Sequence, residues 1–436
     1  MSSFILRGGR VIDPVSGTDV VADVVIEGSM VKEIGATPGA SAEVIDVSGA
    51  VVCPGFVDMH VHLREPGRED EETIASGSAA AALGGFTAIC AMPNTDPVCD
   101  NAAIAEKVAA QGRLIGLADV FPAGAITKGS EGLQLAPIGE MVRSRAAVRI
   151  FTDDGRGVQD ARLLRRAMEY MRGFDVICAE HCEDSSLSEG GQMHEGEFSD
   201  LLGLKGIPAE AEEVALARDL ALARMTGVRF HAMHVSTAGS VELIRRAKAQ
   251  GVQVTAEVTP HHLSLTDAEL VSYNPNLKVN PPLRSASDVE ALRRGVADGT
   301  IDVIATDHAP HAPEEKESEF ESAPPGMLGL QTALGIMVGG LVGAGVVDLV
   351  ALVALMSSRP AQILRIPGHG KLAIGEVANI VVFDPEAVWT VDDADFASPV
   401  RNSPWIGKQM KGRVIHTIHD GDFTVRDGAL MKGAFV

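Results

Sequence analysis

The sequence has no extended run of lysine or arginine, and its 37 basic residues are outnumbered by 59 acidic residues. The formal net charge at pH 7 is −22. Binding to nucleic acid requires a basic patch that neutralises phosphates, so this charge pattern disfavours a nucleic-acid partner. It does not disfavour a small anionic substrate, because the charge of a local site can oppose the field of the whole protein.

Cysteine is scarce, and the five cysteines, Cys53, Cys90, Cys99, Cys178 and Cys182, show no regular spacing. An odd number without a framework predicts reduced thiols and hence a cytoplasmic location. The N-terminal residues lack the long apolar segment of a signal peptide. The apolar segment 332–347 is short for a membrane span, and we interpret it as a buried helix without a membrane role.

Both ends of the chain have the pattern of short β-strands separated by turns. At the N-terminal end, segments 4–6, 10–12, 23–26 and 30–34 alternate with Gly, Pro, Asp and Ser. At the C-terminal end, segments 379–383, 388–391 and 414–418 have the same texture. We therefore predict one small β-sandwich domain assembled from residues 1–54 and 370–436.

Residues 55–369 alternate between apolar strand-like segments and amphipathic helical segments, among them 161–172, 210–226, 240–250 and 287–299. This alternation implies parallel pairing, and eight units of this kind predict a closed (β/α)8 barrel, an α/β fold of the TIM type. No Gly-x-Gly-x-x-Gly motif follows a strand, which disfavours a doubly wound open sheet. The eight predicted strands are 56–62, 86–92, 115–120, 147–152, 175–180, 229–235, 252–258 and 302–306.

Polar residues that can bind metals or substrates stand at the ends of these predicted strands. In a barrel of this type, the carboxyl ends of all strands open on one face, where sites are built. Residues scattered along the sequence would then converge on a single pocket. They are His60, His62, Asn94, Asp153, Asp154, Glu180, His181, His234, Asn280 and Asp307.

The segment His60-Val61-His62 predicts a metal site. Residues two apart on a strand face the same way, so both imidazoles can bind one borderline ion such as Zn²⁺. Asp58 shares their face and is a candidate outer partner. His181 and His234, at the ends of the fifth and sixth predicted strands, are candidates for a second ion.

Two other groups of histidines are less clearly placed. Strand alternation turns His231 away from His234, so we expect it to be structural. His261 and His262 follow the seventh predicted strand, and adjacent residues cannot both face inward, so a direct role for either stays open.

Asp307 ends the eighth predicted strand in Thr306-Asp307-His308. A carboxylate beside a metal-bound hydroxide can take a proton from it and return that proton later, and nearby cations would keep the carboxylate ionised. The alternative is that Asp307 only caps the helix that follows.

Longer segments carry a resemblance to a known family. The whole set is similar to dihydroorotases of the longer bacterial type, within the amidohydrolase superfamily, over nearly the whole chain. The segments are His60-Val61-His62-Leu63-Arg64-Glu65-Pro66-Gly67, Ala91-Met92-Pro93-Asn94-Thr95, Glu257-Val258-Thr259-Pro260-His261-His262-Leu263, Lys278-Val279-Asn280-Pro281-Pro282-Leu283-Arg284, Ala305-Thr306-Asp307-His308-Ala309-Pro310-His311 and Asn402-Ser403-Pro404-Trp405.

The resemblance implies a zinc-dependent, reversible cyclisation of N-carbamoyl-L-aspartate to L-dihydroorotate, the third step of de novo pyrimidine (UMP) biosynthesis. It implies one or two Zn²⁺ per subunit, the first bound by His60 and His62 and the second by His181 and His234, with Asp307 beside them as ligand and as general base and acid. In that mechanism, metal-bound hydroxide attacks the ring amide.

The resemblance also implies a residue that bridges the two metals. Many relatives use a carbamylated lysine there, but residues 148–155 of this chain contain no lysine. An aspartate must therefore serve. The spacing to His181 favours Asp154, and Asp153 stays open as the alternative.

Substrate contacts implied by the resemblance include a guanidinium for the substrate carboxylate and amides for the ring edges. Pro325 stands where relatives often have phenylalanine. Proline lacks an N–H, so only its carbonyl or Gly326 can contact the substrate. The implied residues are His62, Arg64, Asn94, Asn280, His311, Pro325 and Gly326.

Two other functions are compatible with parts of this pattern. One is a hydantoinase or allantoinase acting on a different cyclic amide. The other is a non-catalytic homologue that acts as a scaffold for aspartate transcarbamoylase, although such homologues lose metal ligands that are present here. We expect a small-molecule substrate, no membrane partner, and self-association or association with aspartate transcarbamoylase as further options.

Overall fold

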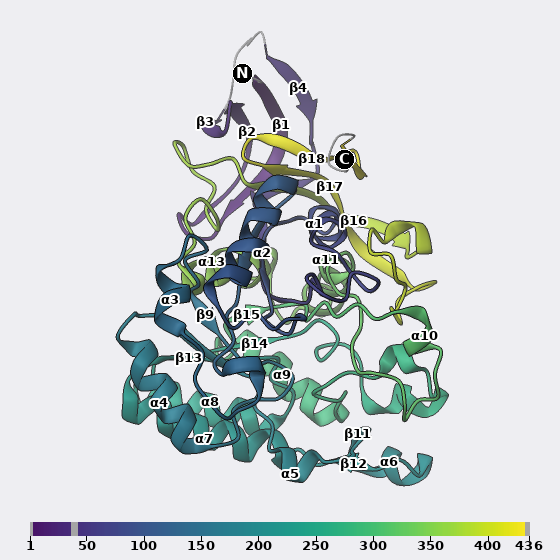
Figure 1. Cartoon of the computed structure of the whole chain (residues 1–436). Coiled ribbons are helices and arrows are strands. Elements are labelled where there is room, and N and C mark those ends of the chain that lie inside the picture. Colours follow the sequence, from purple (N-terminus) through teal and green to yellow (C-terminus); the bar gives the residue numbers. More distant parts are fainter. Residues whose placement is uncertain (1–2, 36–41, 432–436) are drawn as a thin grey trace.

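The computed structural model describes residues 3–35 and 42–431 (Figure 1). The parts of the predicted β segments at residues 1–2, 36–41 and 432–436 lie outside the described residues. None of the helices in the described part of the chain is both long and apolar enough to cross a membrane. The apolar segment 332–347 forms α11 (Ala333–Met337), which continues as a π-helical turn, η4 (Val338–Val342).

Strands from both ends of the chain form one nine-stranded sheet, drawn in purple and yellow at the top of Figure 1. The ends meet where β5 pairs antiparallel with β16, so that Val51 lies opposite Phe383. The order is β19-β18-β17-β16-β5-β1-β2-β3, with β4 beside β1. The strands are β1 (Ser3–Asp13), β2 (Thr18–Glu27), β3 (Met30–Gly35), β4 (Glu43–Asp46), β5 (Val51–Pro54), β16 (Ile380–Thr390), β17 (Gln409–His419), β18 (Asp422–Arg426) and β19 (Ala429–Leu430).

Two pairs of segments predicted as separate strands are in fact single long strands. Segments 4–6 and 10–12 both belong to β1, which has a register shift between Leu6 and Gly9. Segments 379–383 and 388–391 fall largely within β16, which has a register shift between Asp384 and Val388. A bulge lets turn-forming residues stay inside a strand, which is why the sequence pattern suggested breaks.

The middle of the chain contains eight parallel strands in two sheets, besides a short parallel pair, β11 (Met193–His194) and β12 (Gly206–Ile207). One sheet has the order β6-β7-β8 and the other β15-β14-β13-β10-β9. Neighbours in both sheets pair parallel, as the alternating pattern predicted. The strands are β6 (Phe56–Val61), β7 (Phe86–Ala91), β8 (Asp119–Pro122), β9 (Ile150–Phe151), β10 (Ile177–Glu180), β13 (Arg229–Ala232), β14 (Val254–Val258) and β15 (Val303–Ile304).

Two parallel bridges join the edges of these sheets. Gly124, just after β8, bridges Phe151 of β9, and Val61 of β6 bridges His308, just after β15. Backbone hydrogen bonds support both junctions, including one of 2.8 Å from the His62 amide to the His308 carbonyl. The carboxyl ends of the first and last strands therefore lie side by side.

Helices connect the parallel strands, and α4 and α7 have the predicted bounds. By contrast, the strand predicted to start at Ile115 starts at Asp119, because α2 continues to Ile115 and ends at Gly116 with φ 70°. The connecting helices are α1 (Ile74–Leu83), α2 (Ala102–Ile115), α3 (Ile138–Arg143), α4 (Ala161–Arg172), α5 (Ser185–Ser188), α6 (Glu197–Leu202), α7 (Glu210–Thr226), α8 (Ala238–Ala249) and α9 (Ala286–Ala297). After the last parallel strand come α10 (Pro313–Lys316), α12 (Leu349–Val353) and α13 (Arg359–Leu364).

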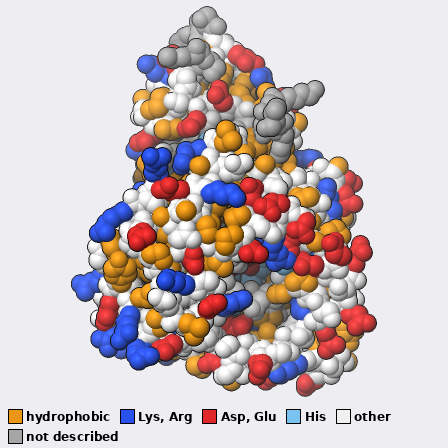
Figure 2. All heavy atoms as spheres, in the orientation of Figure 1, with side chains coloured by type: hydrophobic (Ala, Val, Ile, Leu, Met, Phe, Trp, Pro, Cys, Tyr) orange, Lys and Arg blue, Asp and Glu red, His pale blue; other side chains and the backbone are white. Residues whose placement is uncertain are grey.

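Aromatic side chains pack where the terminal sheet meets the parallel strands. Phe56, at the start of β6, is 1% exposed, and its ring centroid lies 5.7 Å from that of Phe86 and 6.1 Å from that of Phe383. This contact leaves the opposite ends of the parallel strands free of the terminal sheet. Acidic side chains are spread widely over the face in Figure 2, consistent with the net charge of −22.

Candidate metal centre

The predicted metal-binding residues lie at or just beyond the carboxyl ends of five parallel strands. His60 and His62 belong to the end of β6, and His181 follows β10 directly. Asp154, His234 and Asp307 follow β9, β13 and β15 within three residues. Because the strands run in parallel, these side chains meet at the same end of the sheets, where α/β folds of this kind build their sites.

One cluster consists of His60, His62 and Asp307, whose candidate ligand atoms lie within 4.8 Å of one another. Asp307 Oδ1 is 3.0 Å from His62 Nε2 and 3.5 Å from His60 Nε2. All three residues are buried. Both histidines thus direct the same ring nitrogen, Nε2, toward a single carboxylate.

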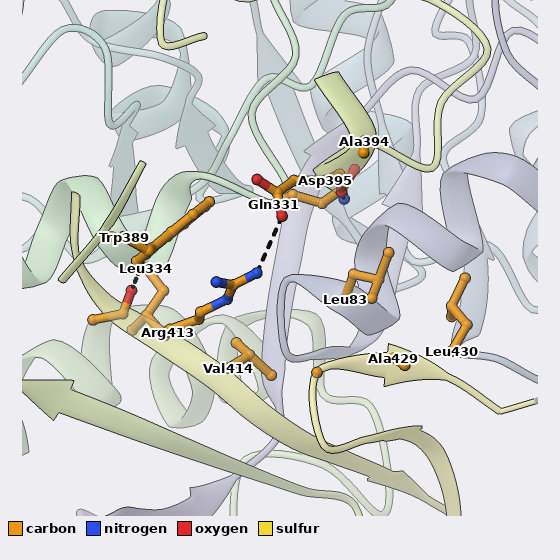
Figure 3. A pocket seen from close by; sticks show the side chains of 13 residues that line it. Leu83, Gln331, Leu334, Trp389, Ala394, Asp395, Arg413, Val414, Ala429 and Leu430 are labelled. Carbon is orange, nitrogen blue, oxygen red and sulfur yellow. Dashed lines mark hydrogen bonds and ion pairs between the residues drawn. The ribbon is translucent and has the colours of Figure 1, made fainter. Parts of the chain in front are cut away.

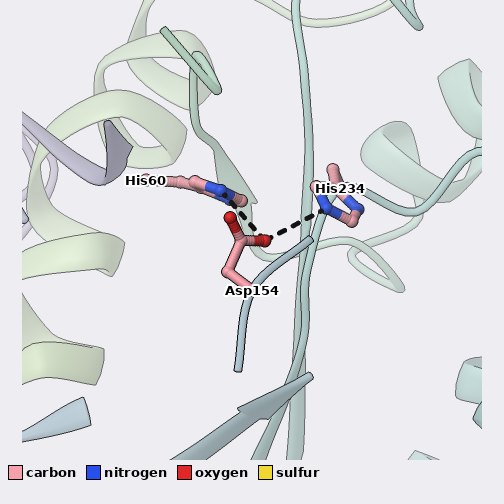
Figure 4. Close-up of side chains that lie close together, drawn as sticks. All are labelled: His60, Asp154 and His234. Carbon is pink, nitrogen blue, oxygen red and sulfur yellow. Dashed lines mark ion pairs between the residues drawn. The ribbon is translucent and has the colours of Figure 1, made fainter. Parts of the chain in front are cut away.

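A second cluster shares His60 and consists of His60, Asp154 and His234 (Figure 4). Asp154 Oδ1 lies 3.6 Å from His60 Nε2, 3.7 Å from His234 Nε2 and 3.9 Å from His181 Nδ1. Its Oδ2 lies 3.5 Å from His62 Nε2. The carboxylate of Asp154 is therefore central to all four predicted histidine ligands.

Asp153 has a different environment, although it is adjacent to Asp154 in sequence. Its Oδ1 accepts hydrogen bonds from the backbone amides of Ile126 (2.8 Å) and Thr127 (3.0 Å), and its Oδ2 accepts from the Thr127 hydroxyl. Asp153 thus braces the loop after β8, and its oxygens have these partners instead of the histidines.

The cluster is electrostatically arranged for positive charge. Burial lowers the pKa of His60, but the charges of Asp154, Glu257 and Asp307 raise that pKa well above its usual value. Burial raises the pKa of Asp154 and of Asp307, but the charge of His60 and hydrogen bonds from histidines hold both well below their usual range. The carboxylates are therefore ionised, and they attract cations.

A divalent cation suits this donor set. His60 Nε2, the nitrogen that faces Asp154 and Asp307, is buried and has no hydrogen-bond partner, which is costly unless another group binds there. Neutral imidazole nitrogens combined with ionised carboxylates are the ligands that Zn²⁺ takes in proteins. The residues present therefore fit a zinc ion, or two ions that share Asp154.

Further acidic residues hold the histidines from outside, and these were not predicted from the sequence as partners. Glu257 Oε1 lies 2.6 Å from His60 Nδ1, and Glu183 Oε2 lies 3.6 Å from His181 Nε2. Asp58 was predicted as an outer partner of the histidines. Its Oδ1 accepts from the backbone amides of His60 and Thr306 at 3.0 and 3.2 Å, so it braces the backbone instead of a ring.

A cavity of about 240 Å³ opens beside these clusters. All of the predicted substrate residues line it, whereas His60 is 0% exposed and lies beneath it. The lining residues are His62, Arg64, Asn94, Asp154, Gly155, His181, His234, Asn280, Asp307, Ala309, His311, Pro325 and Gly326.

Arg64 introduces a guanidinium into the wall of this cavity. It is 7% exposed, its Nε lies 2.9 Å from Glu71 Oε2, and it donates to the Pro310 carbonyl at 3.1 Å. Burial lowers the pKa of Arg64 from its ordinary value, an effect opposed by the charge of Glu71. On the same side of the cavity, His311 Nε2 lies 2.9 Å from the Pro325 carbonyl.

Two asparagines connect the cavity to the histidines. Asn94 Oδ1 lies 2.9 Å from His62 Nδ1, and its Nδ2 donates to Asp154 Oδ2 at 3.3 Å. Asn280 Nδ2 lies 3.3 Å from His181 Nε2, while its Oδ1 is buried and has no hydrogen-bond partner. The amide of Asn280 can thus accept a hydrogen bond from a bound molecule.

The remaining histidines near the site do not line the cavity. His262 is occupied by Thr259 Oγ1 at 2.8 Å and by the Pro281 carbonyl at 2.9 Å. His261 is buried beside it with an unpartnered Nε2. His231 contacts Glu257 Oε2 at 3.0 Å, so it is linked to the site only through that carboxylate.

A larger cavity of about 340 Å³ lies between the terminal sheet and α11 (Figure 3). Its charged lining residues are Arg413 and Asp395, which pair with each other at 3.1 Å, and the Arg413 guanidinium also lies 4.9 Å from the Trp389 ring centroid. No histidine or cysteine occurs among its lining residues. The smaller cavity is therefore the candidate active site.

The fold and the acid–histidine clusters together define an amidohydrolase, and solved structures agree. The structure is similar to L-hydantoinase from Arthrobacter aurescens, with a TM-score of 0.88 and 26% identity over 99% of this chain and 98% of that chain. It also has the fold of dihydropyrimidinase from Brevibacillus agri NCHU1002, with a TM-score of 0.85 over 98% of this chain and 96% of that chain.

Sequence comparisons narrow this class. A family profile described as Dihydro-orotase-like matches residues 49–240. Dihydroorotase from Pelotomaculum thermopropionicum is 52% identical over 97% of this chain and 98% of its own length, and dihydroorotase from Mycobacterium tuberculosis is 48% identical over 98% and 99%. The chain therefore belongs to the dihydroorotase family, and it is a hydrolase that acts on cyclic amides.

Proposed function

We propose that this protein catalyses the reversible cyclisation of N-carbamoyl-L-aspartate to L-dihydroorotate, a step of pyrimidine biosynthesis. The observation that carries the proposal is the single cavity that joins the acid–histidine clusters to Arg64, Asn94 and Asn280. A substrate that is a cyclic amide with a carboxylate substituent would use both parts of this cavity: the acid–histidine clusters for the amide, and Arg64 with the two asparagines for the carboxylate and the ring edges. The identity to relatives named dihydroorotase supports the same conclusion.

Zn²⁺ is the metal that we propose for this centre. His60, His62 and Asp307 would hold one ion, His181 and His234 would hold the other, and Asp154 would bridge them. Bound zinc supplies a water of lowered pKa and a polarised carbonyl. Arg64 binds and orients the substrate carboxylate, because a guanidinium matches carboxylate geometry.

Other cavity residues orient the ring. The amides of Asn94 and Asn280 both donate and accept, which suits the edges of a cyclic amide. His62 and His311 also line the cavity, beside Asp307 and Arg64 respectively, and would contact the substrate there. At the loop 323–326, the Pro325 carbonyl and Gly326 complete the contacts, since proline has no N–H to offer.

Asp307 moves the proton in the proposed mechanism. In the hydrolytic direction it accepts a proton from the attacking water and delivers that proton to the leaving ring nitrogen. In the synthetic direction it takes the proton from the carbamoyl nitrogen. Its ionised state, supported by the histidines around it, is the state that a general base requires.

We also infer the finer architecture. The two parallel sheets would close into a (β/α)8 barrel at 55–369, an inference supported by the bridges Gly124–Phe151 and Val61–His308. The segments 1–54 and 370–436 would form a β-sandwich. In its support, β1 pairs with β4 near Phe4 and with β5 near Val11, and a buried apolar cluster lies among the terminal strands.

Substrate comparison tests the proposed function. We expect zinc-loaded enzyme to turn over carbamoyl aspartate and dihydroorotate, and to be much less active on hydantoin and allantoin. The structural similarity to L-hydantoinase makes hydantoin the necessary competitor. Preferential hydrolysis of hydantoin would favour the hydantoinase function, and a zinc-loaded protein without turnover would favour a scaffold of aspartate transcarbamoylase.

Changing Arg64 to glutamine is expected to raise KM for carbamoyl aspartate more than it lowers kcat. Loss of a charge-assisted contact corresponds to about 2 kcal/mol, or roughly 30-fold in kcat/KM. Arg68→Gln is the matched control, because Arg68 pairs with Glu71 and Glu315 and does not line the cavity. Steady-state kinetics would reject the role of Arg64 if both variants kept the KM of the unaltered enzyme.

Cytoplasmic location, which the cysteine pattern predicts, is a proposal, as are self-association and a complex with aspartate transcarbamoylase. Size-exclusion chromatography with light scattering, with and without aspartate transcarbamoylase from the same organism, would test both kinds of association.

A further inference from the structure

Glu257 is a buried acid near the end of β14, with 1% of its surface exposed. Its partners belong to β6 and to the β13 segment. Oε1 accepts from the His60 ring Nδ1 at 2.6 Å and from the His234 backbone amide at 3.2 Å. Oε2 lies 3.0 Å from His231 Nε2. A single carboxylate is therefore held by three donor groups.

The first consequence concerns the tautomer of His60. When Nδ1 donates to Glu257, the lone pair of the neutral ring lies on Nε2. Nε2 is the atom that faces Asp154 and Asp307, and it has no hydrogen-bond partner. Glu257 thus leaves the atom that points into the cluster free to bind a metal.

The second consequence concerns the backbone of His234. This residue has φ 28°, a positive value that side-chain-bearing residues rarely adopt. The Glu257 carboxylate accepts from the His234 amide, and the Glu257 backbone carbonyl accepts from the following amide, that of Val235, at 3.0 Å. One residue of β14 therefore fixes histidines from both clusters.

His231 in turn fixes Glu257. Its Nδ1 lies 2.8 Å from Thr255 Oγ1 while its Nε2 faces the carboxylate, so both of its ring nitrogens have partners. His231 is 0% exposed. The contacts Thr255–His231–Glu257–His60 thus form a continuous series that is buried at His231, Glu257 and His60 and ends at the metal-facing ring.

We propose that Glu257 is a positioning residue that sets the metal-binding tautomer of His60 and the backbone of His234, and thereby determines the affinity of the centre for zinc. This inference rests on the proposed function, because it takes His60 and His234 to be ligands. Outer carboxylates of this kind alter metal affinity by about 10- to 100-fold when they are removed.

The test is Glu257→Gln, with zinc affinity measured by chelator competition. Glutamine keeps the shape but has one acceptor oxygen for the three donors, so a histidine must change tautomer. Whichever histidine changes, His60 Nδ1 loses its anionic acceptor, so the tautomer with the proton on Nε2, which cannot bind zinc, gains population. We expect zinc affinity to fall by about 10- to 100-fold, while the thermal stability of the metal-free protein changes little in comparison.

Glu212→Gln is the matched control. Glu212 is 4% exposed and accepts from the Ser236 amide at 3.0 Å, so it braces the same segment without touching a predicted ligand. We expect this variant to keep the zinc affinity of the unaltered protein. Equal losses in both variants, or no loss in Glu257→Gln, would overturn the proposal.

A third variant covers the case in which Glu257→Gln does not fold. His231→Gln leaves the carboxylate and the ligands in place but loosens the carboxylate, so we expect a smaller loss of zinc affinity than for Glu257→Gln. If a folded His231→Gln variant kept the zinc affinity of the unaltered protein, the proposed role of Glu257 would then be overturned. If the unaltered protein itself bound no zinc, the proposed metal centre would fail instead.

Discussion

Replacing Asp307 with asparagine is expected to lower kcat by about 10³-fold while the protein keeps its zinc. Asparagine retains an oxygen that can face the metal, and the histidines and Asp154 remain. It cannot, however, accept a proton from water at neutral pH. The 3.0 Å contact of Asp307 with His62 Nε2 supports its position at the reacting atoms. Steady-state kinetics and elemental analysis on the same sample provide the measurement.

The control for this prediction is Asp298→Asn. Asp298 is an acid close to Asp307 in the sequence, and its side chain pairs with Arg245 at the surface. Its replacement should leave kcat unchanged. A general base contributes about 10²- to 10⁴-fold to the rate. A zinc-loaded Asp307→Asn variant whose kcat stays within about 10-fold of the unaltered enzyme would therefore contradict the assigned role.

The adjacent aspartates are expected to respond in opposite ways to the same substitution. Asp154→Asn removes the negative charge that four histidines face at 3.5 to 3.9 Å. We expect zinc affinity to fall by more than about 100-fold, beyond the effect of an outer partner, and activity to fall with it. Dialysis against a chelator followed by elemental analysis measures the loss.

Asp153→Asn serves as the control for its neighbour. It weakens the carboxylate contacts with Ile126 and Thr127, so the free energy of unfolding should fall by about 1–3 kcal/mol while the zinc content stays the same. Chemical denaturation of the two variants separates the effects. The reverse pattern, with zinc lost only from Asp153→Asn, would assign the bridging role to Asp153.

The helices and the order of the parallel strands were predictable because their signals are local. The helix Ala161–Arg172 follows Asp160, whose side chain caps it, and stops at Gly173. The predicted start of β8 was wrong because apolar Ile115 fits either a helix or a strand. In the structure α2 continues to Ile115 and ends at Gly116. Bulged strands such as β1 were divided, since turn-forming residues within them resemble breaks.

The motif residues of the candidate site could also be predicted from the sequence, but the acids that hold its histidines could not. Motif residues such as Arg64 and Asn280 were identified because their neighbours in sequence carry the pattern, and the structure brings them to one cavity. Glu257 and Glu183 were not identified as partners. The sequence does not distinguish a buried acid from an exposed one, and the contact of Glu257 with His60 joins residues 197 positions apart. Such partners become visible only when the strands are assembled.

The pairing of β5 with β16 has a consequence for how the chain folds during synthesis. β5 ends at Pro54, whereas its partner begins at Ile380, so more than 300 residues must be made before one edge of β5 can be covered. Contacts of such long sequence separation form slowly, and an unpaired strand edge is prone to pair wrongly in the meantime.

The four residues of β5 are all buried in the finished fold, and Val51 and Val52 also pair with β1. Until β16 has been translated, the sheet that contains β1 and β5 is therefore incomplete. The residues between them can assemble their own parallel strands first. The free edge of β5 can be covered only in a chain translated past Phe383, the last residue of β16 that pairs with β5.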